Sequence, residues 1–150
     1  MTKTLVFDMD GTIANLYSVE NWLEKLRSED STPYLEAKPM WDMEKLANVL
    51  NAYRANGGTV VIVTWLSMNS TQAYKDAVRK AKREWLEKYN FPFDFFHGVQ
   101  YGTTKANCIR KYTQDAILFD DNTAVREGWH LGETVNPCDT DIIKFIEKLL

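Results

Sequence analysis

The sequence of 150 residues is poor in cysteine, proline and glycine, and it lacks a long apolar run. The two cysteines, Cys108 and Cys138, are far apart and match neither a zinc-ligand spacing nor a disulfide framework, so we expect two reduced thiols. The longest apolar stretch, from Val60 to Leu66, is interrupted by Thr64 and is far shorter than a membrane span. These absences disfavour a disulfide-stapled domain, a zinc domain and a membrane protein.

Other function classes lack their characteristic charges and glycines. The net charge of −3 gives no basic footprint for nucleic acid or an anionic membrane. Neither G-x-G-x-x-G nor G-x-x-x-x-G-K-[ST] occurs, which disfavours dinucleotide-binding and P-loop sites. The first acidic residue, Asp8, comes too early for the apolar core of a signal peptide. We therefore expect a cytoplasmic protein that acts on a small molecule.

The pattern of apolar residues predicts alternating strands and helices in one domain over residues 1–150. Apolar residues make up 45% of the chain and aromatic residues 13%, as in a globular protein. We expect the segment from Ser28 to Pro39 to be a loop, because it is polar and contains Pro33. The expected strands lie at 5–7, 59–64, 93–99, 116–119 and 133–135, and the expected helices lie around 19–26, 46–56, 71–89, 105–112 and 142–149. This alternation predicts an α/β fold with a mainly parallel sheet.

Polar residues follow three of the expected strands. Asp8 and Asp10 come after the first, Thr64 ends the second, and the pair at 120–121 follows the fourth; Lys105 starts a helix that enters from the same edge. Ligands of parallel α/β sheets bind at the carboxyl ends of the strands, so we expect these residues to converge.

Each signal also has an ordinary structural interpretation. The pair Asp139 and Asp141 shows that D-x-D occurs by chance, since it is typical of a helix N-cap. A lysine at a helix start opposes the macrodipole unless an anion lies nearby, which makes Lys105 informative. His97 and His130 stand alone and are expected to be structural or exposed. The order and position of the acidic residues together favour a site.

In order along the chain, the segments VFDMDGT, TVVIVT, YGTTKAN and ILFDD resemble the four motifs of the haloacid dehalogenase superfamily, most of whose members are phosphohydrolases. The resemblance runs from about residue 5 to residue 122. It implies a Rossmann-like three-layer sandwich whose five-stranded, mainly parallel sheet has the strand order 5-4-1-2-3. It also implies a phosphatase that acts on a small phosphomonoester.

The resemblance further implies a role for each matching residue. Asp8 would be the nucleophile that forms an aspartyl-phosphate, and Asp10 the general acid and base. Thr64 would bind phosphate oxygens, and Lys105 would stabilise both the phosphate and Asp8.

The same resemblance implies a magnesium ion held by Asp8, the backbone carbonyl of Asp10, Asp120 and, through water, Asp121. The chemistry of the residue types agrees, because Mg²⁺ prefers hard oxygen ligands and keeps several waters. A cation also offsets the repulsion between an attacking carboxylate and a phosphate dianion. For Asp10 to donate a proton, its pKa must be raised relative to that of Asp8.

The sequence departs from the family pattern at two places. Bulky Trp65 follows Thr64 where the family usually has a small residue, so we expect Trp65 either to wall the phosphate pocket or to reshape the phosphate loop. Residues 14–41 are predicted to hold one helix and a loop, which amounts to a small lid insertion at most, and residues 66–104 hold too little for an α/β lid. We expect a small or absent cap, with a partner subunit as one source of a lid.

The substrate is predicted less directly. Tyr74 and the residues 82–89 resemble the helix that follows the threonine in cytosolic 5′(3′)-deoxyribonucleotidases, and either Trp41 or Trp65 is available to stack a base. A nucleotide, such as a (deoxy)nucleoside monophosphate, is therefore the leading expectation. Two alternatives stay open: a receiver-like phospho-switch, which the acid at Asp10 disfavours, and an inactive metal-binding interaction protein.

Overall fold

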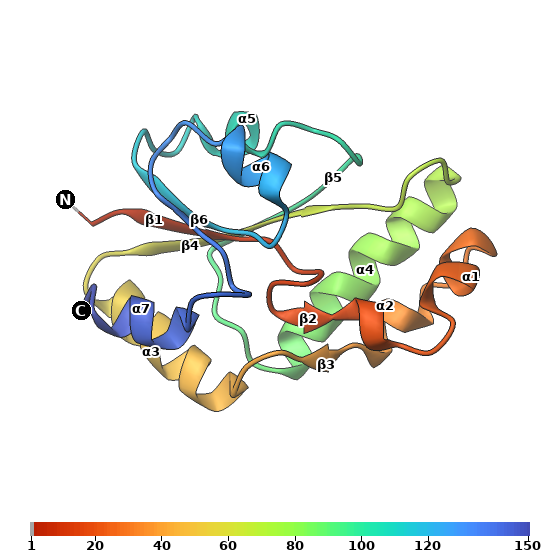
Figure 1. Ribbon diagram of the computed structural model, residues 1–150, viewed down its shortest axis with the longest axis horizontal. Helices are drawn as coiled ribbons and strands as arrows, with labels where there is room; N and C mark the ends of the chain where they lie inside the picture. Colours follow the sequence, from red (N-terminus) through yellow and green to blue (C-terminus); the bar gives the residue numbers. More distant parts are fainter. Residues whose placement is uncertain (1) are drawn as a thin grey trace.

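The computed structural model describes residues 2–150, which form a parallel sheet with helices on both faces (Figure 1). The strands of the main sheet are β1 (Thr4–Phe7), β4 (Thr59–Trp65), β5 (Phe95–Val99), β6 (Ala116–Phe119) and β7 (Thr134–Val135). The helices are η1 (Leu16–Ser18), α1 (Trp22–Arg27), α2 (Thr32–Glu36), α3 (Met43–Ala55), α4 (Gln72–Lys88), α5 (Lys105–Ile109), α6 (Thr123–Glu127) and α7 (Ile142–Glu147). A separate antiparallel pair joins β2 (Ala14–Asn15) to β3 (Lys38–Pro39).

The sheet has the order β5-β4-β1-β6-β7, and all four pairings are parallel. When the strands of this sheet alone are numbered along the chain and read from the β7 edge, the order is 5-4-1-2-3, as expected. The first strand β1 is central, with Phe7 beside Ile62 of β4 and beside Phe119 of β6. The ends of β1, β4 and β6 therefore lie together at one edge of the sheet.

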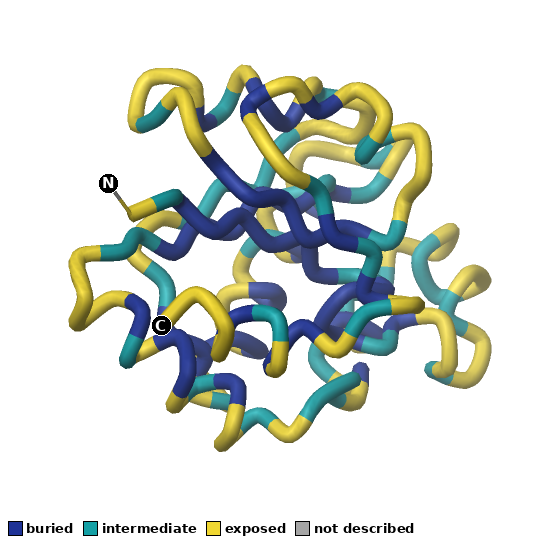
Figure 2. Tube along the Cα trace, turned by 60° about the vertical axis from the view of Figure 1, so that its left-hand side comes forward, coloured by how far each residue is buried: buried dark blue, intermediate teal, exposed yellow. Residues whose placement is uncertain are grey.

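The central strands are buried, as the dark blue segments at the middle of Figure 2 show, and apolar clusters lie on both faces of the sheet. Leu5 and Phe7 pack into the cluster formed with α3, α4 and α7, whereas Val6 packs into the cluster under α5. This alternation follows from the two-residue period of a strand. Since β1 is apolar on both sides, it is fixed in position from both layers, and so is the residue that follows it.

The helix starts agree with the sequence at several places. Thr71 caps α4 by accepting from the backbone N–H of Tyr74, and Asp141 caps α7. Both cysteines are free. Among residues 2–150 we find no helix that combines the length and the apolar character needed to cross a bilayer.

The prediction of a loop from Ser28 to Pro39 is wrong. The segment contains α2 and the strand β3, and Pro33 lies in the first turn of α2 rather than breaking a helix. Proline is tolerated there because the first backbone N–H groups of a helix have no partner within it. Residues 14–39, called the insertion below, thus form a small unit of two short helices, a 3₁₀ turn and a two-stranded pair, larger than the one helix and loop expected.

Smaller corrections concern element ends. The helix that begins at Lys105 ends at Ile109 and not at Tyr112, because the chain turns there with Tyr112 donating to the carbonyl of Ile109. The third strand begins at Phe95, two residues later than expected, since the Asp94 side chain accepts from the N–H of Val60 and fixes the turn before it.

Candidate active site

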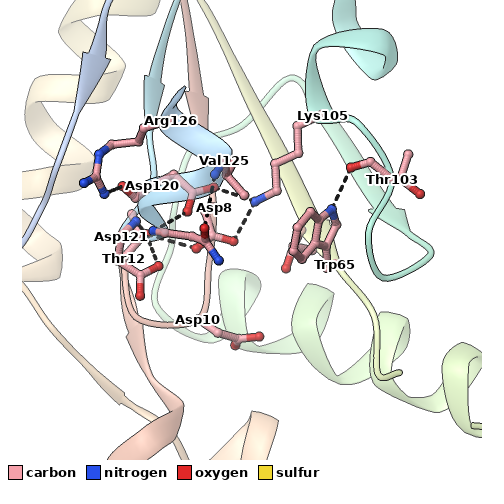
Figure 3. A network of polar contacts seen from close by, with 12 residues as sticks. Asp8, Asp10, Thr12, Trp65, Thr103, Lys105, Asp120, Asp121, Val125 and Arg126 are labelled. Carbon is pink, nitrogen blue, oxygen red and sulfur yellow. Dashed lines mark hydrogen bonds and ion pairs between the residues drawn. The ribbon is translucent and has the colours of Figure 1, made fainter. Parts of the chain in front are cut away.

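Three carboxylates meet at the carboxyl ends of β1 and β6. Asp8 directly follows β1 and Asp120 directly follows β6, and these strands are hydrogen-bonded neighbours. One oxygen from each of Asp8, Asp120 and Asp121 lies within 4.8 Å of the others (Figure 3). The adjacency of two buried parallel strands therefore brings together acids that are more than a hundred residues apart in the chain.

Lys105, the first residue of α5, lies between two of these acids. Its Nζ is 2.9 Å from Oδ1 of Asp8 and 2.7 Å from Oδ2 of Asp120, and the residue is 4% exposed. Burial by itself lowers the pKa of Lys105, but the two carboxylates together raise the pKa above its ordinary value. The unfavourable placement of a cation at a helix start is thus compensated by the anions beside it.

The turn after β1 helps to position the three carboxylates. The hydroxyl of Thr12 lies 3.1 Å from Oδ2 of Asp8, and its oxygen accepts from the backbone N–H of Asp121 at 3.2 Å. Gly11 has φ +80°, and a Cβ there would lie 2.3 Å from Oδ2 of Asp121. Only glycine combines this backbone angle with this lack of bulk, so Gly11 leaves the space that Asp121 fills.

Burial and mutual repulsion shift the titration of the acids. Burial raises the pKa of Asp120 to about 6, with the charge of Asp8 adding to the rise and Lys105 opposing it. Burial and the charge of Asp8 raise the pKa of Asp121 to about 7. Without a further cation, the acids therefore resist full ionisation near neutral pH.

Asp10 stands apart from this group in Figure 3 and has its own partner. Its Oδ2 lies 2.9 Å from Nζ of Lys82, and its side chain is 18% exposed. Burial raises the pKa of Asp10, Lys82 opposes the rise and Asp8 adds to it. The raised pKa has the direction that a proton donor requires.

Lys82 is the site residue that the sequence interpretation missed. It projects from α4, is 1% exposed, and donates to Oγ1 of Thr64 at 2.5 Å and to the carbonyl of Trp65 at 2.8 Å, as well as to Asp10. A signal was present: Lys82 lies four residues after Val78 and three before Trp85, both on the buried stripe of the helix. A lysine within an apolar stripe needs a buried partner, and Asp10 is that partner.

The structure separates the two phosphate-binding candidates that follow one another in the chain. Thr64 is fully buried behind the cavity wall, with its oxygen accepting from Lys82, and its contact with phosphate stays a prediction. Trp65 lines the cavity beside Asp8 and Asp10. Its indole N–H donates to the carbonyl of Thr103 at 2.9 Å, and Nζ of Lys105 lies 5.4 Å from its ring centroid.

Trp41 does not line this cavity. Its indole N–H donates to the carbonyl of Thr12 at 2.8 Å, and its ring borders a separate groove with Lys45 and Lys144. Trp41 therefore supports the turn after β1 from outside, because the short β2–β3 pair brings residue 41 back beneath that turn.

The cavity above the acids has a volume of about 620 Å³. Its floor contains Asp8, Asp10, Lys105, Asp120 and Asp121. The insertion forms one wall. Trp65 at the end of β4, the segment after it and Tyr101 form the other. Four carboxylates and Lys105 line the floor, and Lys82 contacts Asp10 from behind it. The site therefore suits a bound cation and an anionic group that the cation can hold.

Comparisons with known proteins found a similar structure but no matching sequence family. No protein-family model matches the sequence. No curated protein matches it either. The crystal structure of D,D-heptose 1,7-bisphosphate phosphatase from Burkholderia thailandensis superposes with a TM-score of 0.57 and 13% identity, over 97% of this chain and 97% of that one. The chain has a haloacid dehalogenase-like fold. The expected fold is confirmed over nearly the full length, and the sheet order and the position of the acids agree with it.

Proposed function

We propose that the chain is a Mg²⁺-dependent phosphomonoesterase that acts through an aspartyl-phosphate on Asp8. The observation that carries the proposal is the convergence of Asp8, Asp120 and Asp121 within 4.8 Å beside Lys105, at the carboxyl edge of a phosphatase-like fold. Hydrolysis of phosphate monoesters is so slow without a catalyst that a nucleophile, a cation and a proton donor acting together are needed.

The residues present fit a magnesium ion. One carboxylate oxygen each of Asp8, Asp120 and Asp121 lies within 4.8 Å of the others, and Mg²⁺ prefers hard oxygen donors of this kind. Asp8, Asp120 and the backbone carbonyl of Asp10 would hold the ion, and Asp121 would hold its water. When bound, the ion supplies positive charge to the non-bridging oxygens of the phosphate.

The chemistry of the chain's own residues then has two steps. A carboxylate oxygen of Asp8 attacks phosphorus, the bond from phosphorus to the leaving oxygen breaks, and Asp10 gives its proton to that oxygen. Water next attacks phosphorus and gives a proton to Asp10. The bond from phosphorus to the Asp8 oxygen breaks, so inorganic phosphate is released and the Asp8 carboxylate is restored. Lys105 offsets negative charge on Asp8 and the phosphate throughout. Thr64 accepts from Lys82 behind the cavity wall and so helps to hold the lysine that positions Asp10.

Lys82 gives Asp10 a defined position in this scheme. Its contact at 2.9 Å holds the Asp10 carboxylate away from the Asp8 group, and its contacts with Thr64 and Trp65 tie the same point to the end of β4. Asp10 is thereby available to the leaving oxygen, on the cavity side of the floor.

We further propose a (deoxy)nucleoside monophosphate as the candidate substrate. Its support is the aromatic character of the cavity, which Tyr17, Trp22, Trp65 and Tyr101 line. The volume of about 620 Å³ suits a single small molecule.

The test is turnover of p-nitrophenyl phosphate with Mg²⁺, compared with the same assay in EDTA. We expect Asp8→Asn to lower kcat by about 10⁴-fold or more, since removing a catalytic nucleophile elsewhere costs about 10⁶-fold. Asp139→Asn is the matched control, because Asp139 belongs to the other D-x-D pair and is exposed. Substantial activity in Asp8→Asn would remove the nucleophile from the proposal, and a lasting phosphoryl adduct without turnover would favour a phospho-switch.

A further inference from the structure

Tyr34 lines the cavity from α2 but has no part in the two steps proposed above. The residue is 5% exposed and belongs to one apolar cluster with Leu16, Leu66 and Tyr74. This cluster joins the insertion to α4 and to the segment after β4, and α2 packs directly on α4. Because close packing restricts a buried ring, the Tyr34 side chain has a fixed position in the wall.

Lys82 holds Tyr34 and Asp10 close to each other. Its Nζ lies 5.2 Å from the centroid of the Tyr34 ring, in the range of a cation–π contact, and 2.9 Å from Oδ2 of Asp10. Tyr34 and Asp10 both line the cavity, whereas Lys82 is buried behind them. Tyr34 is therefore a neighbour of the proposed proton donor, on the substrate side of Lys82.

The buried tyrosines differ in what their hydroxyl groups contact. Tyr53 and Tyr74 each donate to a backbone carbonyl. The Tyr34 hydroxyl has no hydrogen-bond partner among residues 2–150, although a buried tyrosine usually has one. Within the same residues, the only fully enclosed side-chain polar atom without a partner is Nε2 of His97, so the Tyr34 oxygen keeps access to the cavity.

The Tyr34 hydroxyl is available as a hydrogen-bond donor. Burial raises the pKa of Tyr34, and the charge of Asp10 adds to the rise, so the group keeps its proton. Because the ring is fixed, its oxygen cannot move toward an acceptor of the protein. An acceptor must therefore come from the contents of the cavity, which are water in the free protein and a substrate oxygen in the complex.

We infer that Tyr34 is a specificity-determining residue whose hydroxyl donates a hydrogen bond to an oxygen of the leaving group close to the ester oxygen. The inference rests on the proposed function, because it assumes that Asp10 gives its proton to the ester oxygen. An ester oxygen in contact with Asp10 brings the next atoms of the alcohol toward Tyr34, since Lys82 holds both residues. The substrate class is thus a phosphomonoester of an oxygen-bearing alcohol, such as one with a furanose ring, in place of a plain hydrocarbon alcohol.

The test uses two phosphomonoesters that differ in one ring atom. Tetrahydrofurfuryl phosphate has an ether oxygen next to the carbon that carries the ester arm, and cyclopentylmethyl phosphate has a methylene group in its place. We expect Tyr34→Phe to lower kcat/KM for the ether ester, relative to the hydrocarbon ester, by about tenfold, the effect of one hydrogen bond. The value for the hydrocarbon ester should stay the same, because phenylalanine keeps the ring and its contact with Lys82.

A matched control and a stability measurement test for a merely structural role. Tyr112→Phe removes the same atom from an exposed tyrosine that stacks on Phe95 outside the cavity, and it should leave the ratio of the two esters unchanged. The melting temperature of Tyr34→Phe should stay the same or increase, because the lost hydroxyl has no partner in the protein. A clear decrease would show that the hydroxyl has an internal partner and would overturn the inference.

The outcomes separate the inference from the proposed function. An equal loss for both esters in Tyr34→Phe, or no loss for either, would overturn the role of Tyr34 while leaving the phosphatase intact. If neither ester is hydrolysed, binding of both esters in the presence of Mg²⁺ is measured by calorimetry. Binding of the ether ester that Tyr34→Phe selectively weakens would keep the subsite without the activity. Equal changes for both esters, or absence of binding, would overturn it.

Discussion

The floor and the walls of the cavity are built from different kinds of chain. The acids of the floor follow strands of the central sheet, and Lys105 begins a helix that packs on this sheet. Buried neighbours on both faces of the sheet fix their positions. Apart from Trp65, which ends β4, the wall residues lie on short helices, turns and loops. The floor therefore provides chemistry common to many esters, and the walls select among the esters. Changes to the floor should affect every substrate alike, and changes to the wall should affect substrates unequally.

Of the three predictions that follow, the one for Lys82→Met has the largest expected effect. It removes the cation that holds Asp10, so we expect kcat to fall about 10²-fold for aromatic and aliphatic esters alike, the usual contribution of a positioned acid or base. The protein should also melt at a lower temperature, because a carboxylate loses its buried partner. Steady-state kinetics and circular dichroism measure both.

Lys80→Met is the matched control for this change. Lys80 lies on the same helix, its side chain is 80% exposed, and its ion pair with Glu84 at 3.9 Å is a surface contact. If Lys82→Met lowered kcat for the aromatic ester only, Lys82 would act in substrate selection, as the walls do. That result would contradict the proposed difference between floor and walls.

The pH dependence should give the next largest effect. In the metal-free protein the pKa values of Asp120 and Asp121 are raised to about 6 and about 7, above their unfolded values. The folded state thus holds protons that the unfolded state has lost, so the stability of the metal-free protein should decrease as pH rises from 5 to 8. Mg²⁺ needs both groups ionised, so its affinity should increase at least about tenfold over the same range.

Melting temperatures in EDTA and in excess Mg²⁺, at several pH values, measure both trends. Asp121→Asn removes one of the titrating groups, and its metal-free form should show a weaker dependence on pH than the parent protein. A metal-free melting temperature that increases from pH 5 to pH 8 would contradict the raised pKa values.

Glu29→Gln should give the smallest effect, and it should be selective. Glu29 has a left-handed backbone (φ 58°), and its two oxygens accept from the N–H of Thr71 at 2.9 Å and from its hydroxyl at 2.8 Å. Tyr74 makes a neighbouring link to the carbonyl of Asp30. These contacts fasten the insertion to the start of α4, and glutamine keeps only one of the two acceptors.

We expect a rise of about threefold in KM for thymidine 5′-monophosphate, with little change for glycerol 2-phosphate, since only a surface hydrogen bond is lost. Glu24→Gln is the control, because Glu24 is an exposed acid on the same insertion. An equal rise for both esters would show that the fastening supports the floor as well.

The sequence was informative about the floor for a physical reason. A parallel sheet places the carboxyl ends of neighbouring strands at one edge, so Asp8 and Asp120 could be placed together from the strand pattern alone. Lys105 was informative because a cation at a helix start needs anions nearby. These rules concern strand order and helix ends, which local sequence specifies well.

The same rules say little about the walls. The strands β2 and β3 have two residues each, too few to show a period, and Pro33 resembles a loop residue until its place in the first turn of α2 is known. Lys82 is one of several lysines on α4, and only its phase relative to Trp85 distinguishes it. The burial of Thr64 behind Lys82 depends on packing between distant segments, which no local pattern records.

The pairing of Ala14 with Pro39 has a practical consequence. Because these residues are neighbours across β2 and β3, the chain departs from the catalytic layer and rejoins it at adjacent points, and the contacts of Glu29 and Tyr74 attach the segment between them to α4. A protein engineer could exchange the segment between them for a different loop while leaving every acid and both lysines untouched. New selectivity would then be sought by grafting about two dozen residues instead of redesigning the reaction centre.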